Sequence, residues 1–409
     1  MTLWMPNKKK PLYAPMLASF GGGSVRGFRS IGGGPKLNIT APSKFVFVYE
    51  DNAASRYEQY SVDSSGNISN TYNTSVADSD GDRIASATLS STEFVKIQGF
   101  NPRMDRLQLT SGFSVLDSDT SPPFGSSEAQ MSVVGCGPSK FCYLYSDGST
   151  GNIIIDSVDA SIDATTNQDS VTSNMGNAET STGGSSGYKF ALHALKIPEK
   201  DKILITNKDK CEIVDYSQFN NLSKEGTASL SHTGAWNTVL YTDNPEIMAI
   251  LTIGNASPNS DGTLRVSYID VTGNLGPTLL GTGSAGTQLS PQITNDNSGT
   301  GPWAYYCGKN RFVYAETGSI RLYELDPVNY TVTLLNSAFF SSFGWDTKPM
   351  WMGEDVVGIL MPNASNNNQI DVRSYKILAN NTLSLVDTFN QNASDTVRHT
   401  TALPLYNLP

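Results

Sequence analysis

The sequence repeats one strand-rich unit seven times. Each unit contains a short, largely apolar run rich in Val, Ile, Tyr and Phe and bounded by Gly, Asn, Asp or Ser. Successive runs begin about 52 residues apart, close to the ~40–50 residues of a four-stranded propeller blade. The runs are Phe45–Glu50, Glu93–Ile97, Phe141–Ser146, Ile203–Asn207, Ile247–Ile253, Phe312–Glu316 and Val356–Met361. The repeat predicts an all-β, seven-bladed β-propeller.

The remainder of each unit fits the same interpretation. A turn and a third strand follow each run, and several of these strands alternate apolar with polar residues, as in Arg56–Asp63 and Thr263–Asp270. A turn and a weaker strand such as Thr331–Asn336 come next. Because no helical periodicity is sustained anywhere, the remaining structural alternative is a tandem of β-sandwiches.

The first and last units differ from the others in a way that suggests ring closure. A further strand precedes most of the apolar runs, but residues 36–43 are a poor strand. The strand-like segment His399–Asn407 has no later partner. We therefore expect it to pair with Phe45–Glu50 and complete the first blade, since an open array would expose sheet edges. The predicted domains are a basic, extended arm at 1–43 and the propeller at 44–409.

Charge is distributed unevenly between these two parts. The chain carries a net charge of −10, yet residues 1–43 contain no Asp or Glu. The arm is +6 through residue 36, which leaves −16 on the rest of the chain. Its cations are Lys8, Lys9, Lys10, Arg26, Arg29 and Lys36. Such asymmetry suggests a tail that docks onto an acidic partner, with a solvated flexible tail as the alternative. The acidic body argues against nucleic-acid binding by the globular part.

No catalytic or metal-binding pattern is present. His193, His232 and His399 stand in no triad or metal spacing, and each is expected to end a strand or line a blade. Asp78–Asp82 resembles the start of a calcium loop but lacks the glycine and glutamate that complete one, so an acidic turn is the preferred interpretation. No repeated turn typical of sialidase-like propellers occurs. We expect no enzymatic activity, no metal and no cofactor.

Cysteines, tryptophans and long irregular stretches each allow two interpretations. Cys136 and Cys142 flank a short turn and could form a disulfide across a hairpin or act as small buried residues. Aromatic side chains near the blade starts could stack on sugars, although core packing between blades is favoured. These are Trp236, Trp303, Trp345 and Trp351. Ser157–Gly187 and Thr282–Gly301 are either binding loops or solvated insertions.

No apolar run reaches the ~20 residues of a membrane span. Lys8–Lys10 followed by Leu12–Phe20 weakly imitates a signal peptide, but Pro11 and Pro15 interrupt it.

The arm carries seven glycines between Gly21 and Gly34, interspersed with aromatic residues and arginines. Its segment Phe20–Phe28 (FGGGSVRGF) resembles the N-termini of structural proteins from phages of aquatic bacteria. The resemblance implies a virion protein anchored through Tyr13–Gly34 to other virion structural proteins, present in several symmetric copies. Host surface glycans are a further expected partner. The expected anchor residues are Trp4, Tyr13, Phe20, Arg26, Phe28 and Arg29.

Two other functions remain open at this point. A carbohydrate-binding module without a virion role would need exposed aromatic side chains but no anchoring arm. A glycan-degrading propeller would need a pair of carboxylates at one mouth of the central channel.

Overall fold

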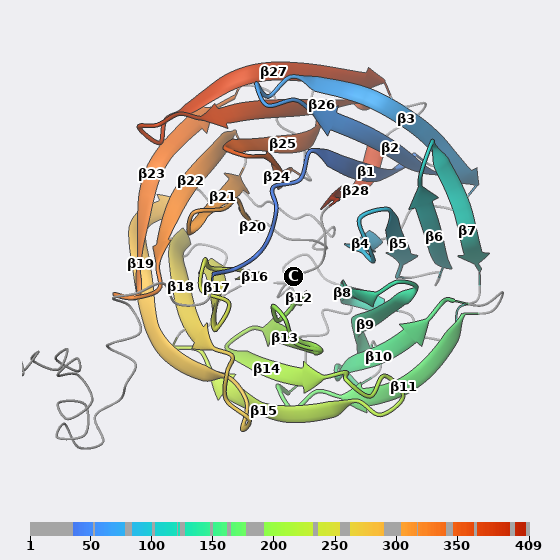
Figure 1. The fold of residues 1–409 in the computed structure, drawn as a ribbon, viewed down its shortest axis with the longest axis vertical. Helices are drawn as coiled ribbons and strands as arrows, with labels where there is room; N and C mark the ends of the chain where they lie inside the picture. Colours follow the sequence, from blue (N-terminus) through green and yellow to red (C-terminus); the bar gives the residue numbers. More distant parts are fainter. Residues whose placement is uncertain are drawn as a thin grey trace, which may run out of the picture. The chain divides into compact units, whose positions relative to one another are not determined.

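Seven four-stranded antiparallel sheets form a closed ring in the computed structural model (Figure 1), which confirms the predicted β-propeller. Leu37–Pro409 form one compact unit. The structure describes residues 36–51, 54–77, 84–99, 103–120, 122, 127–147, 150–161, 165–176, 192–231, 236–253, 262–289, 304–316, 318–340, 347–363, 366–392 and 397–405. Residues 1–35 lie outside this set.

Each blade contributes one strand to the wall of the central channel. These innermost strands are β28 (Val397–Pro404), β4 (Ile84–Thr88), β8 (Ser127–Gly137), β12 (His193–Lys196), β16 (Trp236–Leu240), β20 (Ala304–Tyr306) and β24 (Lys348–Gly353). The second strands are β1 (Lys44–Asp51), β5 (Glu93–Gln98), β9 (Lys140–Asp147), β13 (Lys202–Asn207), β17 (Ile247–Ile253), β21 (Arg311–Glu316) and β25 (Val356–Asn363). All seven apolar runs of the sequence fall on second strands.

The outer half of each blade consists of two further strands. The third strands are β2 (Ala54–Val62), β6 (Arg103–Leu109), β10 (Ile153–Asp159), β14 (Lys210–Asp215), β18 (Gly262–Asp270), β22 (Ser319–Asp326) and β26 (Asn366–Ile377). The outermost strands are β3 (Ile68–Ala77), β7 (Phe113–Asp119), β11 (Thr166–Thr172), β15 (Ser223–Ser229), β19 (Thr278–Leu289), β23 (Thr331–Phe339) and β27 (Leu383–Asn392).

Burial explains why the second strands are the most apolar. Five of the six residues of β5 are buried, because neighbouring blades cover both faces of the strand. Outer strands such as β27 instead alternate between half-buried and exposed residues, since one face meets solvent. The core is accordingly divided among the blade interfaces. One cluster, for example, joins Phe45 and Phe47 of β1 to Met350 and Leu360 of the last blade.

The C-terminal strand closes the ring as predicted. β28 pairs antiparallel with β1, with Phe45 opposite Pro404 and Phe47 opposite Ala402. Sequence reasoning placed this strand at His399–Asn407, whereas it begins two residues earlier and ends at Pro404. Residues 406–409 lie outside the described part of the chain.

Aspartates shape the turns between third and outermost strands. Five of the seven third strands are followed or ended by such a residue: Asp63, Asp159, Asp215, Asp270 and Asp326. In each case the carboxylate accepts the backbone N–H two residues later, at 2.8 Å for Ser65 and 2.9 Å for Val328. Hydrogen bonds from Asn67 and Asn329, with smaller contributions from Ser65 and Val328, hold the pKa of Asp63 and Asp326 below its usual range.

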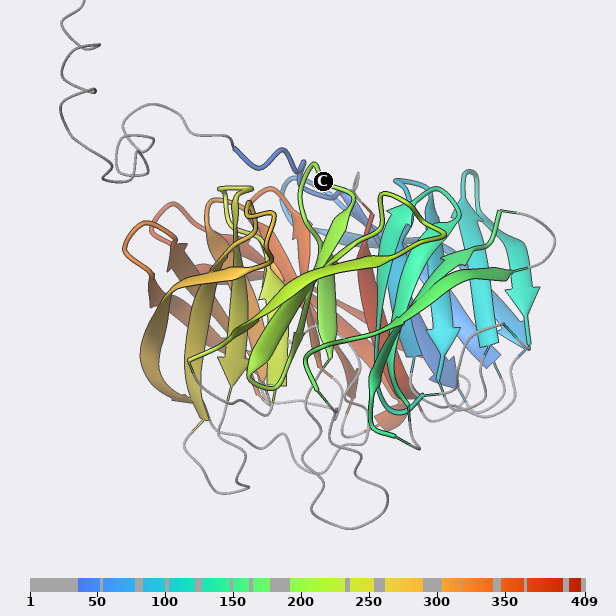
Figure 2. The ribbon, with the colours of Figure 1, turned by 90° about the horizontal axis from the view of Figure 1, so that it is seen from below.

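A short segment without regular structure, Leu37–Ser43, lies on the turn face that carries these aspartates; we call it the strap. It crosses from near β16 to β1 in Figure 1, and Figure 2 shows it on the same face as the end of β28. Leu37 donates its backbone N–H to the Asp243 carbonyl at 2.8 Å. Leu37, Ile39 and Ala41 pack against the core of the later blades. The last residues of the predicted arm therefore contact the propeller itself.

Candidate functional site in the central channel

Two adjacent cavities lie among the innermost strands. The first has a volume of about 80 Å³ and is bordered by β4, β8, β12 and β28. The second has a volume of about 60 Å³ and lies between β12, β16 and β20, with Ile39 of the strap and Trp351 also lining it. Both are lined by His193, Leu195, Tyr241, Tyr305 and Pro404. These shared residues make the two cavities a single candidate site.

His193 lies where the cavities meet. Its Nδ1 accepts the backbone N–H of Val239 in β16 at 3.0 Å, a bond that ties together the inner strands of two blades. Burial lowers the pKa of His193 to about 4, so the ring is neutral at pH 7. Since Nδ1 acts as an acceptor, the ring proton belongs on Nε2, for which no hydrogen-bond partner is found among the described residues.

Aromatic side chains form one wall of the second cavity. Tyr306 packs edge-on against Trp351 at a centroid distance of 5.8 Å and against Tyr241 at 6.3 Å. Trp351 is 6% exposed and donates its indole N–H to the Gly353 carbonyl at 2.8 Å. For Trp351, the predicted packing between blades is thus confirmed. Trp303, Trp345 and the side chain of Trp236 lie outside the described residues.

The strap rests on turns that are linked from blade to blade. The Asp243 carboxylate accepts hydrogen bonds from the Tyr306 hydroxyl and, at 2.8 Å, from the Asn310 backbone N–H. In the next turn Asp355 pairs with Arg311 and, at 2.7 Å, with Lys309. Partial burial opposes ionisation of Asp355, but these two cations hold its pKa below the usual range. Three successive blades are thereby fixed at the strap-covered mouth.

The described lining has little catalytic potential. Its ionisable side chains are His193, Lys196 and the tyrosines, and no Asp or Glu is among them. Glycoside hydrolysis requires two carboxylates about 5–10 Å apart. The lining instead combines apolar surface with a few hydrogen-bond donors, a composition suited to binding a small molecule.

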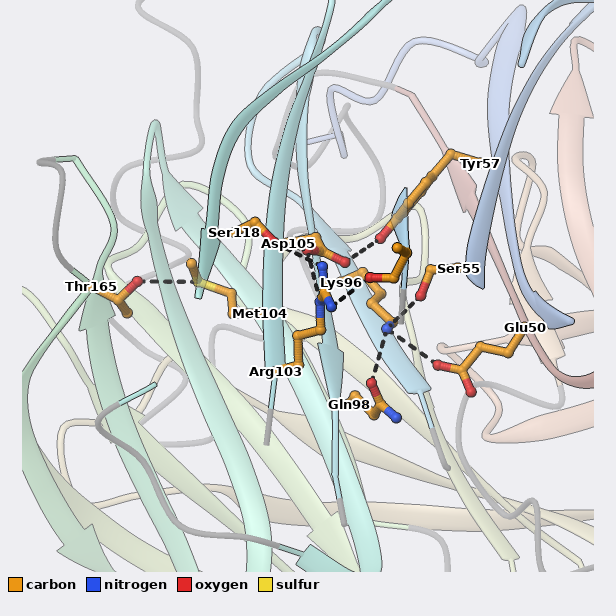
Figure 3. Close-up of polar contacts among 11 residues, drawn as sticks. Glu50, Ser55, Tyr57, Lys96, Gln98, Arg103, Met104, Asp105, Ser118 and Thr165 are labelled. Carbon is orange, nitrogen blue, oxygen red and sulfur yellow. Dashed lines mark hydrogen bonds and ion pairs between the residues drawn. The ribbon is translucent and has the colours of Figure 1, made fainter. Parts of the chain in front are cut away.

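A second polar cluster joins blades 1 and 2 (Figure 3). Lys96 of β5 is fully buried; its ammonium group lies 3.2 Å from Glu50 Oε1 and 2.8 Å from Ser55 Oγ. Nearby, the Tyr57 hydroxyl donates a hydrogen bond to Asp105 Oδ2 at 2.7 Å. Burial is the larger cause that raises the pKa of Tyr57, and the charge of the Asp105 carboxylate is the second. Because Lys96 exposes no surface to a dissolved substrate, the cluster is a structural connection between blades.

Most residues singled out from the sequence lie outside the described part of the chain. They include the expected anchor residues, Trp4, Tyr13, Phe20, Arg26, Phe28 and Arg29, and also Asp78–Asp82 and His232. His399 lies in β28, but its side chain is not described. The described residues contain no cluster of His, Cys, Asp or Glu that could hold a metal ion.

The two cysteines that flank the turn between β8 and β9 face each other. Cys136 and Cys142 come from β8 and β9, and their sulfur atoms are 3.5 Å apart. A disulfide has an S–S length of about 2.05 Å, so both are free thiols in this structure. Cys142 is fully buried, and the contact with Cys136 and burial raise the pKa of its thiol.

Sequence reasoning missed the residues that line the cavities beside His193. Lys196, Tyr241 and Tyr305 lie in or beside inner strands, and β12 and β20 have only four and three residues. Strands this short show no measurable periodicity. The strap offered a signal, however, because Leu37, Ile39 and Ala41 alternate with polar residues.

Comparisons with known proteins identify the architecture. No family model and no curated protein matches the sequence. Among solved structures, a protein from Lactobacillus plantarum aligns with a TM-score of 0.59 and 12% identity, covering 88% of this chain and 99% of that one. The periplasmic gluconolactonase PpgL of Pseudomonas aeruginosa aligns with a TM-score of 0.56 and 8% sequence identity, and the alignment covers 90% of this chain and 100% of that one. A hypothetical selenium-binding protein from Sulfolobus tokodaii aligns with a TM-score of 0.60 and 6% sequence identity, and the alignment covers 90% of this chain and 94% of that one.

These likenesses place the chain in the structural class of β-propellers. Identities this low support the shared fold alone. Within the described residues, no helix is long and apolar enough to cross a membrane.

Proposed function

We propose that this chain is a non-enzymatic phage virion protein in which the arm attaches the propeller to a neighbouring capsid or tail protein. The observation that carries the proposal is the strap. Leu37 is bound to Asp243 at one mouth of the channel, so the basic arm joins the propeller at a defined face. An anchor that starts at one face leaves the opposite face available to other partners.

The distribution of connections supports this orientation. Inner strands run toward the strap face, and outermost strands run away from it, as required by their antiparallel order. β11 therefore ends, and β12 begins, at the opposite face, with residues 173–192 between them. β19 ends and β20 begins there too. We propose that this face projects from the particle toward host surface glycans, because long connections on rigid scaffolds often carry binding.

Charge and lining chemistry support the remaining parts of the proposal. An arm of +6 is suited to an acidic partner, whereas the body of −16 is not suited to nucleic acid. The described channel lining has no carboxylate pair, which favours attachment over glycan hydrolysis. A free carbohydrate-binding module would not require an anchoring arm.

The test is cross-linking mass spectrometry on purified particles of the phage that carries this gene. We expect the protein in several copies per particle, with Lys8, Lys9 and Lys10 cross-linked to a different virion protein. A chain lacking residues 1–35 should be absent from particles although its propeller folds.

A matched variant separates specific anchoring from simple charge attraction. Phe20→Ala with Phe28→Ala keeps every cation of the arm, and we expect it to reduce incorporation strongly. Absence of the protein from purified particles would contradict the virion role. Cross-links from Lys8–Lys10 confined to the protein's own propeller would contradict the anchor.

A further inference from the structure

The central cavities have an unequal distribution of polar groups. The first is bordered by hydroxyl side chains, namely Ser86, Thr88, Ser132 and Thr401, and by Lys196. The second is bordered mainly by Tyr241, Tyr305, Tyr306 and Trp351, with Ile39 of the strap. The first cavity therefore offers polar groups among apolar residues such as Ala85, Met131 and Val133, and the second is mainly aromatic. A molecule that fills both must have the same two-part character.

Two hydrogen-bond donors of this space have no partner among the described residues. His193 is 8% exposed, and its Nδ1 is already occupied by the Val239 N–H, which leaves Nε2–H as a donor. No described residue forms an ion pair with Lys196, and no Asp or Glu is among the described residues that line the two cavities. Lys196 is half-buried, so its ammonium group and His193 Nε2–H can both donate to an acceptor bound in the cavity.

The volume of the two cavities matches a single ring. At about 80 and 60 Å³, the two cavities together approach the ~150 Å³ that holds one benzene molecule in a dry apolar cavity. Short hydroxyl side chains on the polar side leave room for one small acceptor group.

We propose that the central channel binds a small aromatic monocarboxylate, with its ring against the tyrosines and Trp351 and its carboxylate directed to His193 and Lys196. This activity is independent of the virion role, because none of these residues belongs to the arm. Ile39 of the strap lines the second cavity, so the strap and the propeller both contribute to the site.

The test uses benzoate as the probe and benzyl alcohol as its neutral counterpart, measured by calorimetric titration of the full chain at pH 7. We expect saturable binding of one benzoate per chain, at least tenfold tighter than benzyl alcohol. Lys196→Met should remove this preference while binding of benzyl alcohol is retained. Lys44→Met, which removes an exposed lysine that lines neither cavity, should leave both affinities unchanged.

The outcomes discriminate clearly. Absence of saturable binding by wild-type protein would overturn the proposal and leave the channel as a water-filled or closed space. Equal loss of benzoate binding in Lys196→Met and Lys44→Met would show attraction by overall charge, which would also overturn it. Thermal unfolding of each variant is recorded first, so that a misfolded variant is recognised. If Lys196→Met does not fold, Lys196→Gln is used in its place.

Discussion

Single residues decide how closely the inner strands approach each other. Gly135 of β8 lies against β4, where a Cβ atom would be only 2.0 Å from the Thr88 carbonyl oxygen. Backbone atoms cannot yield as a flexible side chain can, so any larger residue must displace an inner strand. Close packing of the channel wall thus depends on the absence of a side chain at this position.

We predict that Gly135→Ala lowers the free energy of unfolding by about 3 kcal/mol, the upper end of the range for overpacking. Gly353→Ala is the matched control, since its Cβ would meet the nearest atoms at 3.6 Å, an ordinary contact distance. The control should change stability by less than about 1 kcal/mol. Urea denaturation of both variants measures the effect; equal midpoints would refute the close approach.

His193 predicts a defined pH dependence of stability. Its pKa is about 4 in the folded protein against ~6.5 when unfolded, so the unfolded chain binds the proton more readily. The neutral His193 therefore contributes fully to the free energy of unfolding above pH 6.5. As the pH falls toward 4, this free energy decreases by about 3 kcal/mol. In His193→Asn, the amide oxygen can still accept the Val239 N–H but does not titrate.

Unfolding free energies at pH 7 and pH 4 for wild type and His193→Asn measure this effect. The wild type should lose about 3 kcal/mol more than the variant, because the carboxylates that also titrate are common to both. An identical loss in the two proteins would place His193 in a solvated environment.

At the scale of elements, β28 is the strand on which ring closure depends. Val397, Ala402 and Leu403 are buried, and the strand supplies the inner edge of the first blade. Deletion of residues 397–409 should cost about 5 kcal/mol or more and lower the Tm by about 10 °C. Deletion of residues 406–409 alone retains the strand and should leave the Tm nearly unchanged. Calorimetry of both truncations would disprove the closure if they melted together.

Sequence predicted these elements to different extents. The second strands were predictable because burial on both faces requires a continuous apolar run, as in Ile247–Ile253. Closure was predictable because the first unit lacks an inner strand that the last segment can supply. The strap showed an alternation of apolar and polar residues, but the contacts of Ile39 and Lys196 could not be predicted, since they depend on tertiary packing and not on local pattern. The expected anchor residues of the arm stay predictions.

At the scale of the molecule, the propeller has two unlike faces and a channel without a carboxylate pair in its described lining. We predict that the purified protein releases no reducing ends from common polysaccharides above the buffer rate. The likeness to a gluconolactonase concerns the fold and does not alter this expectation. Hydrolysis that disappeared on substitution of a single Asp or Glu would show that the interpretation is wrong.

Ring closure by the first and last strands also has a consequence for biosynthesis. β1 is the first of the described strands to be translated, yet its partner β28 is the last of them. Until then, the apolar β1 has an unpaired edge, and the interface between the first and last blades is incomplete. A nascent chain must therefore keep this edge from pairing with other chains during most of its translation. Truncated products, from ribosome stalling for example, are the species in which aggregation of this protein should begin.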